Sequence, residues 1–362
     1  MSINDNGKSR GPDTYGVLAT PQTGLNLRET GKRLVKTALM NSGVLAVAFR
    51  LAPNGIVVLH YHSVQDNTKR FANAFVPGTI HALSLFEEQM ELVAHRYCPV
   101  GMDDVLRSLN GEVNLPPRAV AVTFDDGFAD NFELAAPVLN RLGIRALFNL
   151  VVGSIEAPNP PWFCRLHHAF STTTRETWPD SSDGCIRPIA NPEDRRAAFL
   201  TASRRCAMSI GRSQEGMISK IEEELDAEPL ERKNCPMMTW DQARELRRMG
   251  HLIGSHSLSH PNLAYLDDLS VWTEVVESKA RLEAELRGPV DYFSYPNPIM
   301  TPNFDERTIR ITEQAGYKLA AHGDTGPVRA GQNPLSVHRV PAPWSLGEFI
   351  WYIENTMIGR RL

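Results

Sequence analysis

Two groups of side chains in this sequence have the types and spacing that metal-assisted hydrolysis requires. Adjacent carboxylates stand at Asp125 and Asp126, before Gly127, and two imidazoles stand four residues apart at His256 and His260. Histidines at this spacing can point at one position in space, and a carboxylate from another element would complete a metal site with a place left for water. The second carboxylate could then act as the general base that deprotonates this water.

Each group alone has an ordinary structural interpretation. Asp-Asp-Gly is often a solvated turn, and two nearby histidines can be satisfied by local hydrogen bonds. The elements expected to carry them favour chemistry instead. The apolar run 120–124 predicts a buried strand that ends at the carboxylates, and 252–256 predicts another that ends at the histidines.

Strand and helix patterns alternate along most of the chain. Seven segments predict strands: 56–64, 120–124, 146–152, 252–256, 292–295, 318–321 and 335–340. Apolar residues at helical spacing predict helices at 85–97, 132–142, 240–249, 270–286 and 305–315. The alternation predicts an α/β fold, a distorted and closed or nearly closed (β/α) barrel of about seven strands, with the site at the carboxyl ends of the strands.

The alternation stops between residues 156 and 236. Prolines, a polar loop at 171–184 and helical pieces at 195–206 and 216–225 replace it. We interpret 156–236 as an insertion that covers one end of a main domain spanning 55–362, since insertions are tolerated in loops and loops shape sites. A separate small domain is the alternative.

The segment before the main domain has two parts. The polar residues 1–26 predict disorder, and 27–54 predicts a basic amphipathic helix that ends at a Pro-Asn-Gly break. Residues 27–51 of that helix would either lie on a membrane surface or pack on the main domain. The start lacks the basic-then-apolar pattern of a secretory signal, so we expect a cytoplasmic protein, with peripheral contact at the inner membrane face if the helix binds lipid.

Composition excludes several classes of protein. The 362 residues carry 38 basic and 42 acidic side chains, a net charge of −4, without a dense basic stripe, which argues against a nucleic-acid partner. The 5 cysteines are odd in number and never form a C-x-x-C pair, which argues against a disulfide framework and a thiolate zinc site.

Thr123-Phe-Asp-Asp-Gly127 together with His256-Ser-Leu-Ser-His260 resembles the polysaccharide deacetylase family, the NodB-homology domain of carbohydrate esterase family 4. Further stretches agree with this resemblance at 59–64, 86–90, 160–162, 238–240, 293–296, 339–341 and 344–346. The resemblance covers about 56–349, interrupted by the insertion. The front half is closer to the poly-N-acetylglucosamine deacetylase branch.

The resemblance implies a role for each side chain of the two motifs. Asp126, His256 and His260 would hold a divalent metal, zinc first, with cobalt, nickel or manganese as alternatives. Asp125 would be the base. The implied reaction is N-deacetylation of an amino sugar in a polysaccharide or in a lipid- or nucleotide-linked precursor, in which water activated at the metal attacks the acetamide.

The resemblance also implies an oxyanion site and a general acid. The oxyanion would be held by the metal and by a backbone N–H near Tyr295 and Pro296. Two histidines compete for the acid role, His62 near the end of the first predicted strand and His338 near the C-terminal end. We favour His62, because the Tyr-His context matches the first branch. For His60 we favour an ordinary structural role, with a supporting position on the same face of the strand as the alternative.

The third family motif departs from the usual pattern. Ser294 and Pro298 stand where many members carry an arginine that orients the base and a glycine. Arg339 is the expected replacement, approaching from another strand. Two alternative functions stay open: hydrolysis of another amide or ester, and a catalytically silent glycan-binding protein. Trp162, Phe163 and Trp240 would be available to stack on sugar rings.

Overall fold

The computed structural model describes residues 55–67, 74–76, 78–296 and 300–359. The segments 1–26 and 27–54, with the predicted amphipathic helix and its membrane contact at 27–51, lie outside these residues. Pro298 of the third motif does so too. Within the described residues, none of the helices combines the length and apolarity that crossing a bilayer requires.

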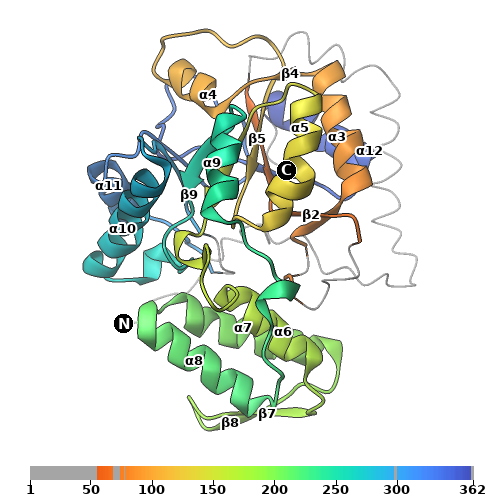
Figure 1. Cartoon of the computed structure of the whole chain (residues 1–362), viewed down its shortest axis with the longest axis vertical. Helices are drawn as coiled ribbons and strands as arrows, with labels where there is room; N and C mark the ends of the chain where they lie inside the picture. Colours follow the sequence, from red (N-terminus) through yellow and green to blue (C-terminus); the bar gives the residue numbers. More distant parts are fainter. Residues whose placement is uncertain (1–54, 68–73, 77, 297–299, 360–362) are drawn as a thin grey trace, which may run out of the picture.

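A curled parallel sheet forms the centre of the molecule (Figure 1). Its strand order is β11-β10-β9-β6-β5-β1-β12, and the short β4 (Cys98–Pro99) pairs with the outer part of β5. The strands of the main path are β1 Val57–Tyr61, β5 Ala119–Phe124, β6 Ala146–Leu150, β9 Leu252–Ser255, β10 Tyr292–Ser294, β11 Leu319–Ala321 and β12 Val340–Pro341. All seven predicted strands are therefore present.

The sheet curls into a half-barrel whose two edges approach each other. Val337, just before β12, forms a parallel bridge with Ala321 of β11. Its N–H donates to the carbonyl of Ala320 at 2.9 Å, and His322 N–H donates back to the carbonyl of Val337 at 2.9 Å. The predicted distorted barrel is confirmed in this nearly closed form.

The sheet alternates its side chains between two apolar layers. Val57, Leu59 and Tyr61 of β1 face the larger core, which the surrounding helices cover, whereas Val58 faces a smaller core on the other side. The covering helices are α3 Leu83–Arg96, α5 Ala136–Arg141, α9 Trp240–Arg248, α10 Asp268–Leu286, α11 Glu306–Gln314 and α12 Leu346–Met357. Since successive strand residues point to opposite faces of the sheet, the side chains of His60 and His62 lie on the same face as Val58, the face of the smaller core.

Two helices have features that the sequence patterns did not predict. The helix expected over 132–142 begins with a π-helical turn, Asn131–Ala135, which continues into α5. In α10, the large apolar side chain of Trp272 is 41% exposed, while Glu274 is buried. The buried positions of α10 therefore follow 271, 274, 275 and 278, with a carboxylate among them.

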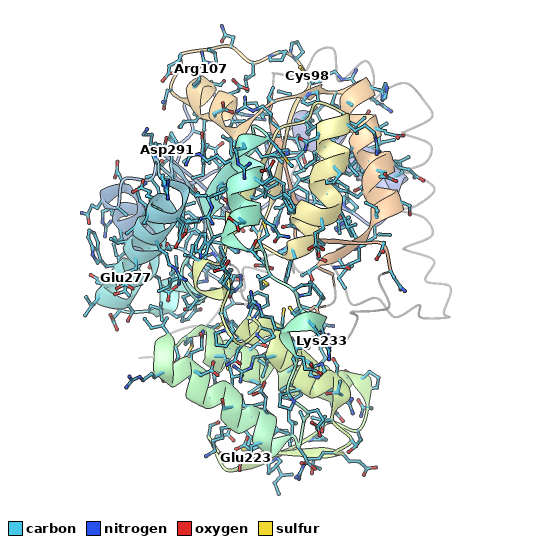
Figure 2. All side chains as sticks on the ribbon, in the orientation of Figure 1. Cys98, Arg107, Glu223, Lys233, Glu277 and Asp291 are labelled. Carbon is cyan, nitrogen blue, oxygen red and sulfur yellow. The ribbon has the colours of Figure 1, made fainter. Side chains whose placement is uncertain are left out.

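The insertion folds around an apolar core of its own at the carboxyl ends of the strands (Figure 1). It contains α6 Trp162–Thr172, β7 Thr177–Asp180, β8 Cys185–Pro188, α7 Pro192–Ala207 and α8 Gly211–Glu224. Arg107, in α4 (Met102–Leu109), and Glu223, in α8, lie at opposite ends of the molecule (Figure 2). The insertion therefore lengthens the molecule along its long axis.

The polar stretch 171–184 is not the simple loop that its composition predicted. It contains β7, which pairs antiparallel with β8. Trp178 is completely buried there, and the buried carboxylate of Asp180 accepts hydrogen bonds from Arg187 and Arg205. One buried aromatic side chain and one paired carboxylate thus order a segment whose average composition is that of a loop.

Candidate metal site and hydrolytic centre

Asp126, His256 and His260 come together at the carboxyl ends of β5 and β9. Nε2 of His256 lies 3.7 Å, and Nε2 of His260 lies 3.5 Å, from Oδ1 of Asp126. All three side chains are buried, and Oδ1 of Asp126 has no hydrogen-bond partner among the described residues. A buried, unpartnered carboxylate oxygen facing two imidazole nitrogens fits a divalent metal, whose ligand bonds are about 2.0–2.2 Å.

The tautomer of His256 is set by a backbone carbonyl. Nδ1 of His256 donates a hydrogen bond of 2.8 Å to the carbonyl oxygen of Ser294, which leaves the lone pair on Nε2, the nitrogen that faces Asp126. Metal-binding histidines commonly have such a partner on the second ring nitrogen. Burial lowers the pKa of His256 to about 4 and that of His260 well below its usual value, so both rings are neutral near pH 7.

The backbone around the three side chains is strained. Asp126 has φ 73°, Ser257 has φ 64° and His260 has φ 61°, all in the left-handed region. Non-glycine residues in such conformations cost about 1–3 kcal/mol each and cluster at functional sites. The two motifs are therefore held in shapes that their sequences alone would not adopt.

Glu274 of α10 stabilises the histidine-bearing loop. Its buried carboxylate accepts hydrogen bonds from the backbone N–H groups of Leu258 (3.0 Å) and Ser259 (2.8 Å) and from the hydroxyl of Ser259 (2.6 Å). Sequence reasoning missed this residue. The signal that could have found it is a carboxylate beside Val271 and Val275 on the apolar face of a helix.

Asp125 has a different set of partners from Asp126. Arg339 donates to both of its oxygens at 2.8 Å, Asn149 Nδ2 donates to Oδ1 at 2.8 Å, and the Ser294 hydroxyl donates to Oδ2 at 3.0 Å. Burial alone would raise the pKa of Asp125, but Arg339, with the nearby His256 and His60, holds this pKa well below its usual range.

The pKa of Asp126 is shifted in the opposite direction from that of Asp125. Burial, together with the neighbouring Asp125 carboxylate, raises the pKa of Asp126 well above its usual value. No arginine forms an ion pair with it in the described part of the chain, where Arg339 is used by Asp125. A bound cation would supply the positive charge that the Asp126 carboxylate lacks.

Arg339 occupies the place that the third motif leaves open. Ser294 is short, and its hydroxyl accepts a hydrogen bond of 2.8 Å from Nη2 of Arg339. The guanidinium, 1% exposed, thus reaches Asp125 from the segment before β12. Arg339, just before β12, thus makes the contact with Asp125 that the resemblance implied, and its part in catalysis stays a prediction.

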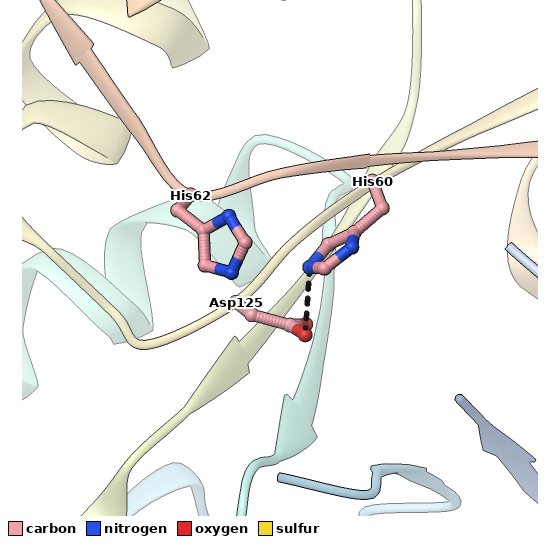
Figure 3. Close-up of side chains that lie close together, drawn as sticks. All are labelled: His60, His62 and Asp125. Atoms are coloured by element: carbon pink, nitrogen blue, oxygen red, sulfur yellow. Dashed lines mark ion pairs between the residues drawn. The ribbon is translucent and has the colours of Figure 1, made fainter. Parts of the chain in front are cut away.

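His60 and His62 project from β1 toward Asp125 (Figure 3). Their ring centroids are 4.4 Å apart, and Nε2 of His60 lies 3.1 Å from Oδ2 of Asp125. One donor atom from each of these three residues lies within 4.8 Å of the others. The main-chain carbonyl of His62 accepts a hydrogen bond of 2.6 Å from Asn131, which fixes the backbone at this point.

The structure does not bring His338 to this group. Nδ1 of His338 lies 3.2 Å from the carbonyl oxygen of Asp324, and its ring packs against His322 at 4.7 Å. Strand β12 pairs Val340 with Leu59, so His338 lies toward the amino ends of the strands. His62 follows the carboxyl end of β1, where the carboxylates are.

The predicted oxyanion donors at Tyr295 and Pro296 are not available. The backbone N–H of Tyr295 already donates to the carbonyl of Ala321 at 2.9 Å, and its hydroxyl donates to the carbonyl of Leu335 at 3.0 Å. Proline has no backbone N–H. The hydrogen bonding of β10 continues through Tyr295, so its N–H is already used, and an oxyanion donor near these two residues stays a prediction. The next residues, 297–299, lie outside the described ones.

The three aromatic side chains expected to stack on sugars have different positions. Trp240 is 4% exposed and belongs to the main core, and Trp162 is 6% exposed. Nε1 of Trp162 donates to the carbonyls of Ser259 (3.1 Å) and His260 (3.3 Å). Phe163 is half-buried and packs 4.7 Å from the His260 ring. Of the three, Phe163 is the side chain that still borders the site with part of its surface accessible.

Comparison with known proteins agrees with this geometry. The family model described as polysaccharide deacetylase matches residues 112–320. YxkH of Bacillus subtilis (strain 168), which carries the family's name, is 21% identical over 240 residues, which cover 66% of this chain and 57% of the relative. The poly-beta-1,6-N-acetyl-D-glucosamine N-deacetylase of Escherichia coli (strain K12) is 27% identical over 107 residues, 29% of this chain and 15% of that protein. The chain thus spans less than two thirds of either relative.

Two solved structures show the same fold. Streptococcus pyogenes deacetylase PplD, in complex with acetate, aligns with a TM-score of 0.54 at 19% identity, over 84% of this chain and 99% of that one. IcaB from Ammonifex degensii aligns with a TM-score of 0.54 at 18% identity, over 84% and 98%. The family match includes both motifs of the candidate metal site. This chain belongs to the polysaccharide deacetylase family.

Proposed function

We propose that this chain is a metal-dependent N-deacetylase that removes acetyl groups from amino sugars, in a polysaccharide or in a lipid- or nucleotide-linked glycan precursor. One observation carries the proposal: two adjacent carboxylates have different partners. Asp126 turns an unpartnered oxygen toward two neutral imidazoles, whereas Arg339 holds Asp125. The first carboxylate is suited to bind a metal and the second to accept a proton. The family, and the N-deacetylase among the relatives, support a carbohydrate amide as the substrate.

Asp126, His256 and His260 would hold the metal. Zinc is our first candidate for a site of two imidazoles and one carboxylate, with cobalt, nickel or manganese as alternatives. When bound, such an ion polarises an amide carbonyl and lowers the pKa of a water molecule. The two rings are already neutral, so they can offer lone pairs without first losing a proton.

Asp125 would accept the proton of the attacking water. Its low pKa keeps the carboxylate ionised at neutral pH, and its bonds to Arg339 and Asn149 fix it in place. The water oxygen forms a bond to the acetyl carbon, and the bond from that carbon to the sugar nitrogen breaks. His62, on the same side as Asp125, would give the departing nitrogen its proton. The products are acetate and a free amino sugar.

The test compares two histidine variants that the structure separates. Zinc-loaded wild type, His62→Gln and His338→Gln are assayed for acetate release from N-acetylglucosamine oligomers. We expect kcat of His62→Gln to fall by about 100-fold or more, as for loss of a general acid, and His338→Gln to stay close to wild type. Equal loss in both variants, or full activity after complete removal of metal, would contradict the proposal.

A further inference from the structure

We propose that His60 is a positioning residue, which fixes the Asp125 carboxylate and the ring of His62 relative to each other. This inference rests on the proposed function, since it assigns His60 to the base and acid of that reaction. The contacts that carry it are the 3.1 Å approach of His60 Nε2 to Asp125 Oδ2 and the 4.4 Å separation of the His60 and His62 rings (Figure 3).

The backbone of His60 is fixed from both neighbouring strands. His60 is in register with Thr123 of β5 and with Pro341 of β12. Its carbonyl accepts a hydrogen bond of 3.1 Å from the N–H of Ala342. A side chain on a central strand has little freedom to move along the sheet, so the ring of His60 is a rigid support rather than a mobile one.

The other contacts of Asp125 indicate what the ring of His60 does. Arg339 and Asn149 bind Oδ1, and Arg339 and Ser294 bind Oδ2. The N–H of His60 is not aligned for a straight hydrogen bond, yet the described residues offer its buried Nε2 no better partner than Asp125. His60 therefore limits how far the carboxylate can turn about its bonds to Arg339.

The same contact explains how two catalytic side chains from different strands keep their spacing. His62 follows the end of β1, and its backbone is held by Asn131. Its ring packs against His60, and His60 in turn packs against Asp125. Loss of the His60 ring would leave a gap between the base and the acid, and misplacement by about 1 Å can cost on the order of 100-fold in rate.

A second metal ion is the competing interpretation, because one donor atom each of His60, His62 and Asp125 lies within 4.8 Å of the others. The charge of Arg339 opposes it. The guanidinium already neutralises Asp125 through two bonds, so a dication placed there would meet two neutral rings and a positive neighbour. No arginine or lysine among the described residues pairs with Asp126, which is why we assign the metal there.

The test uses His60→Leu, which removes the ring nitrogens, and His60→Gln, whose side-chain amide can place an N–H near the position of Nε2. His338→Leu is the matched control. For zinc-loaded proteins we measure kcat and KM for acetate release, metal content by mass spectrometry, and the carbon-13 shift of the Asp125 carboxylate with the nitrogen-15 shifts of His62.

We expect His60→Leu to lower kcat by about 10- to 100-fold with KM little changed, His60→Gln to recover much of the loss, and metal content to stay at wild-type level. The Asp125 and His62 signals should move in His60→Leu and not in the control. Unchanged signals, or unchanged kcat in an active enzyme, would overturn the proposal, and so would loss of one of two metal equivalents. If wild type releases no acetate, the proposed function fails, while the signals still decide the role of His60.

Discussion

Arg339 and Asp125 form two parallel hydrogen bonds of 2.8 Å across a separation of 214 residues in the chain. Both side chains are buried, at 1% exposure each. Such paired bonds fix the carboxylate in the plane of the guanidinium, which no single donor would do. The proposed base follows β5, but its orientation depends on Arg339, which lies just before β12 at the edge of the sheet.

Replacing Arg339 by Met should destabilise the fold and impair catalysis together. The change leaves the Asp125 carboxylate buried without its counter-charge, and breaking such a pair costs about 3–5 kcal/mol. We expect urea unfolding to show a loss of this size. Arg248→Met is the control, because Arg248 is exposed and pairs with Glu245 on the surface of α9, where a salt bridge contributes about 0–1 kcal/mol. A loss no larger than that of the control would contradict a structural role for the pair.

Metal content should depend on the two histidines of the second motif. Wild type is expected to bind about one divalent ion, and His256→Ala and His260→Ala are expected to lose it, because each removes one of three ligands. Mass spectrometry of the purified proteins measures this directly. Removing the metal with a chelator should also lower the melting temperature of wild type, since a ligand that binds the native state stabilises it. A wild type that stays empty after zinc is added would refute the assignment.

Glu274→Gln should weaken metal binding although Glu274 touches no proposed ligand side chain. The carboxylate accepts three hydrogen bonds from the loop that carries His260, and a neutral amide cannot replace all of them. Loss of such supporting contacts commonly costs 10- to 100-fold in metal affinity. Titration against a competing chelator measures the change.

Glu277→Gln is the control for this experiment. Glu277 lies on the same helix but is exposed, and Figure 2 shows it on the outer side of the molecule. The metal affinity of the Glu277→Gln variant should match that of wild type. If the two variants behave alike, the loop does not depend on the buried carboxylate.

Folding stability should fall as pH rises from about 4 to 7 because of Asp130. Burial raises the pKa of Asp130 to about 7, against hydrogen bonds from Ser63, Val64, Asn131 and Gln65 that favour the charged form. Since the folded state binds this proton more tightly than the unfolded state, stability is lost as the proton leaves, by up to about 4 kcal/mol. Asp130→Asn should flatten this part of the curve of unfolding free energy against pH. An unchanged slope would show that Asp130 is ionised throughout.

The sequence was sufficient for the sheet and for the two motifs because both are encoded locally. Apolar runs of four to seven residues mark buried strands, and parallel strands bring their carboxyl ends to one edge. Asp125, Asp126, His256 and His260 meet for this reason. The preference for His62 over His338 as general acid came from the resemblance and stays a prediction, although His62 is the one of the two that lies near Asp125.

Other features depend on contacts between distant parts of the chain and could not be read from local patterns. Glu274 is buried because it binds backbone N–H groups, and Trp272 is exposed because the helix turns that carboxylate inward instead. The N–H of Tyr295 is used by Ala321, a pairing set by how far β10 and β11 extend together. The segment 156–236 was distinguished by its lost alternation, and its interpretation as an insertion stays a prediction, whereas its hairpin depends on the burial of Trp178.

The indole of Trp162 belongs to the apolar core of the insertion, yet it donates its N–H to the carbonyls of Ser259 and His260. The apolar core of 156–236 and the loop that carries His260 are therefore connected through one side chain. For protein engineering, this means that a substitution which repacks the core around Trp162 should also displace His260, so 156–236 cannot be redesigned independently of the proposed metal site.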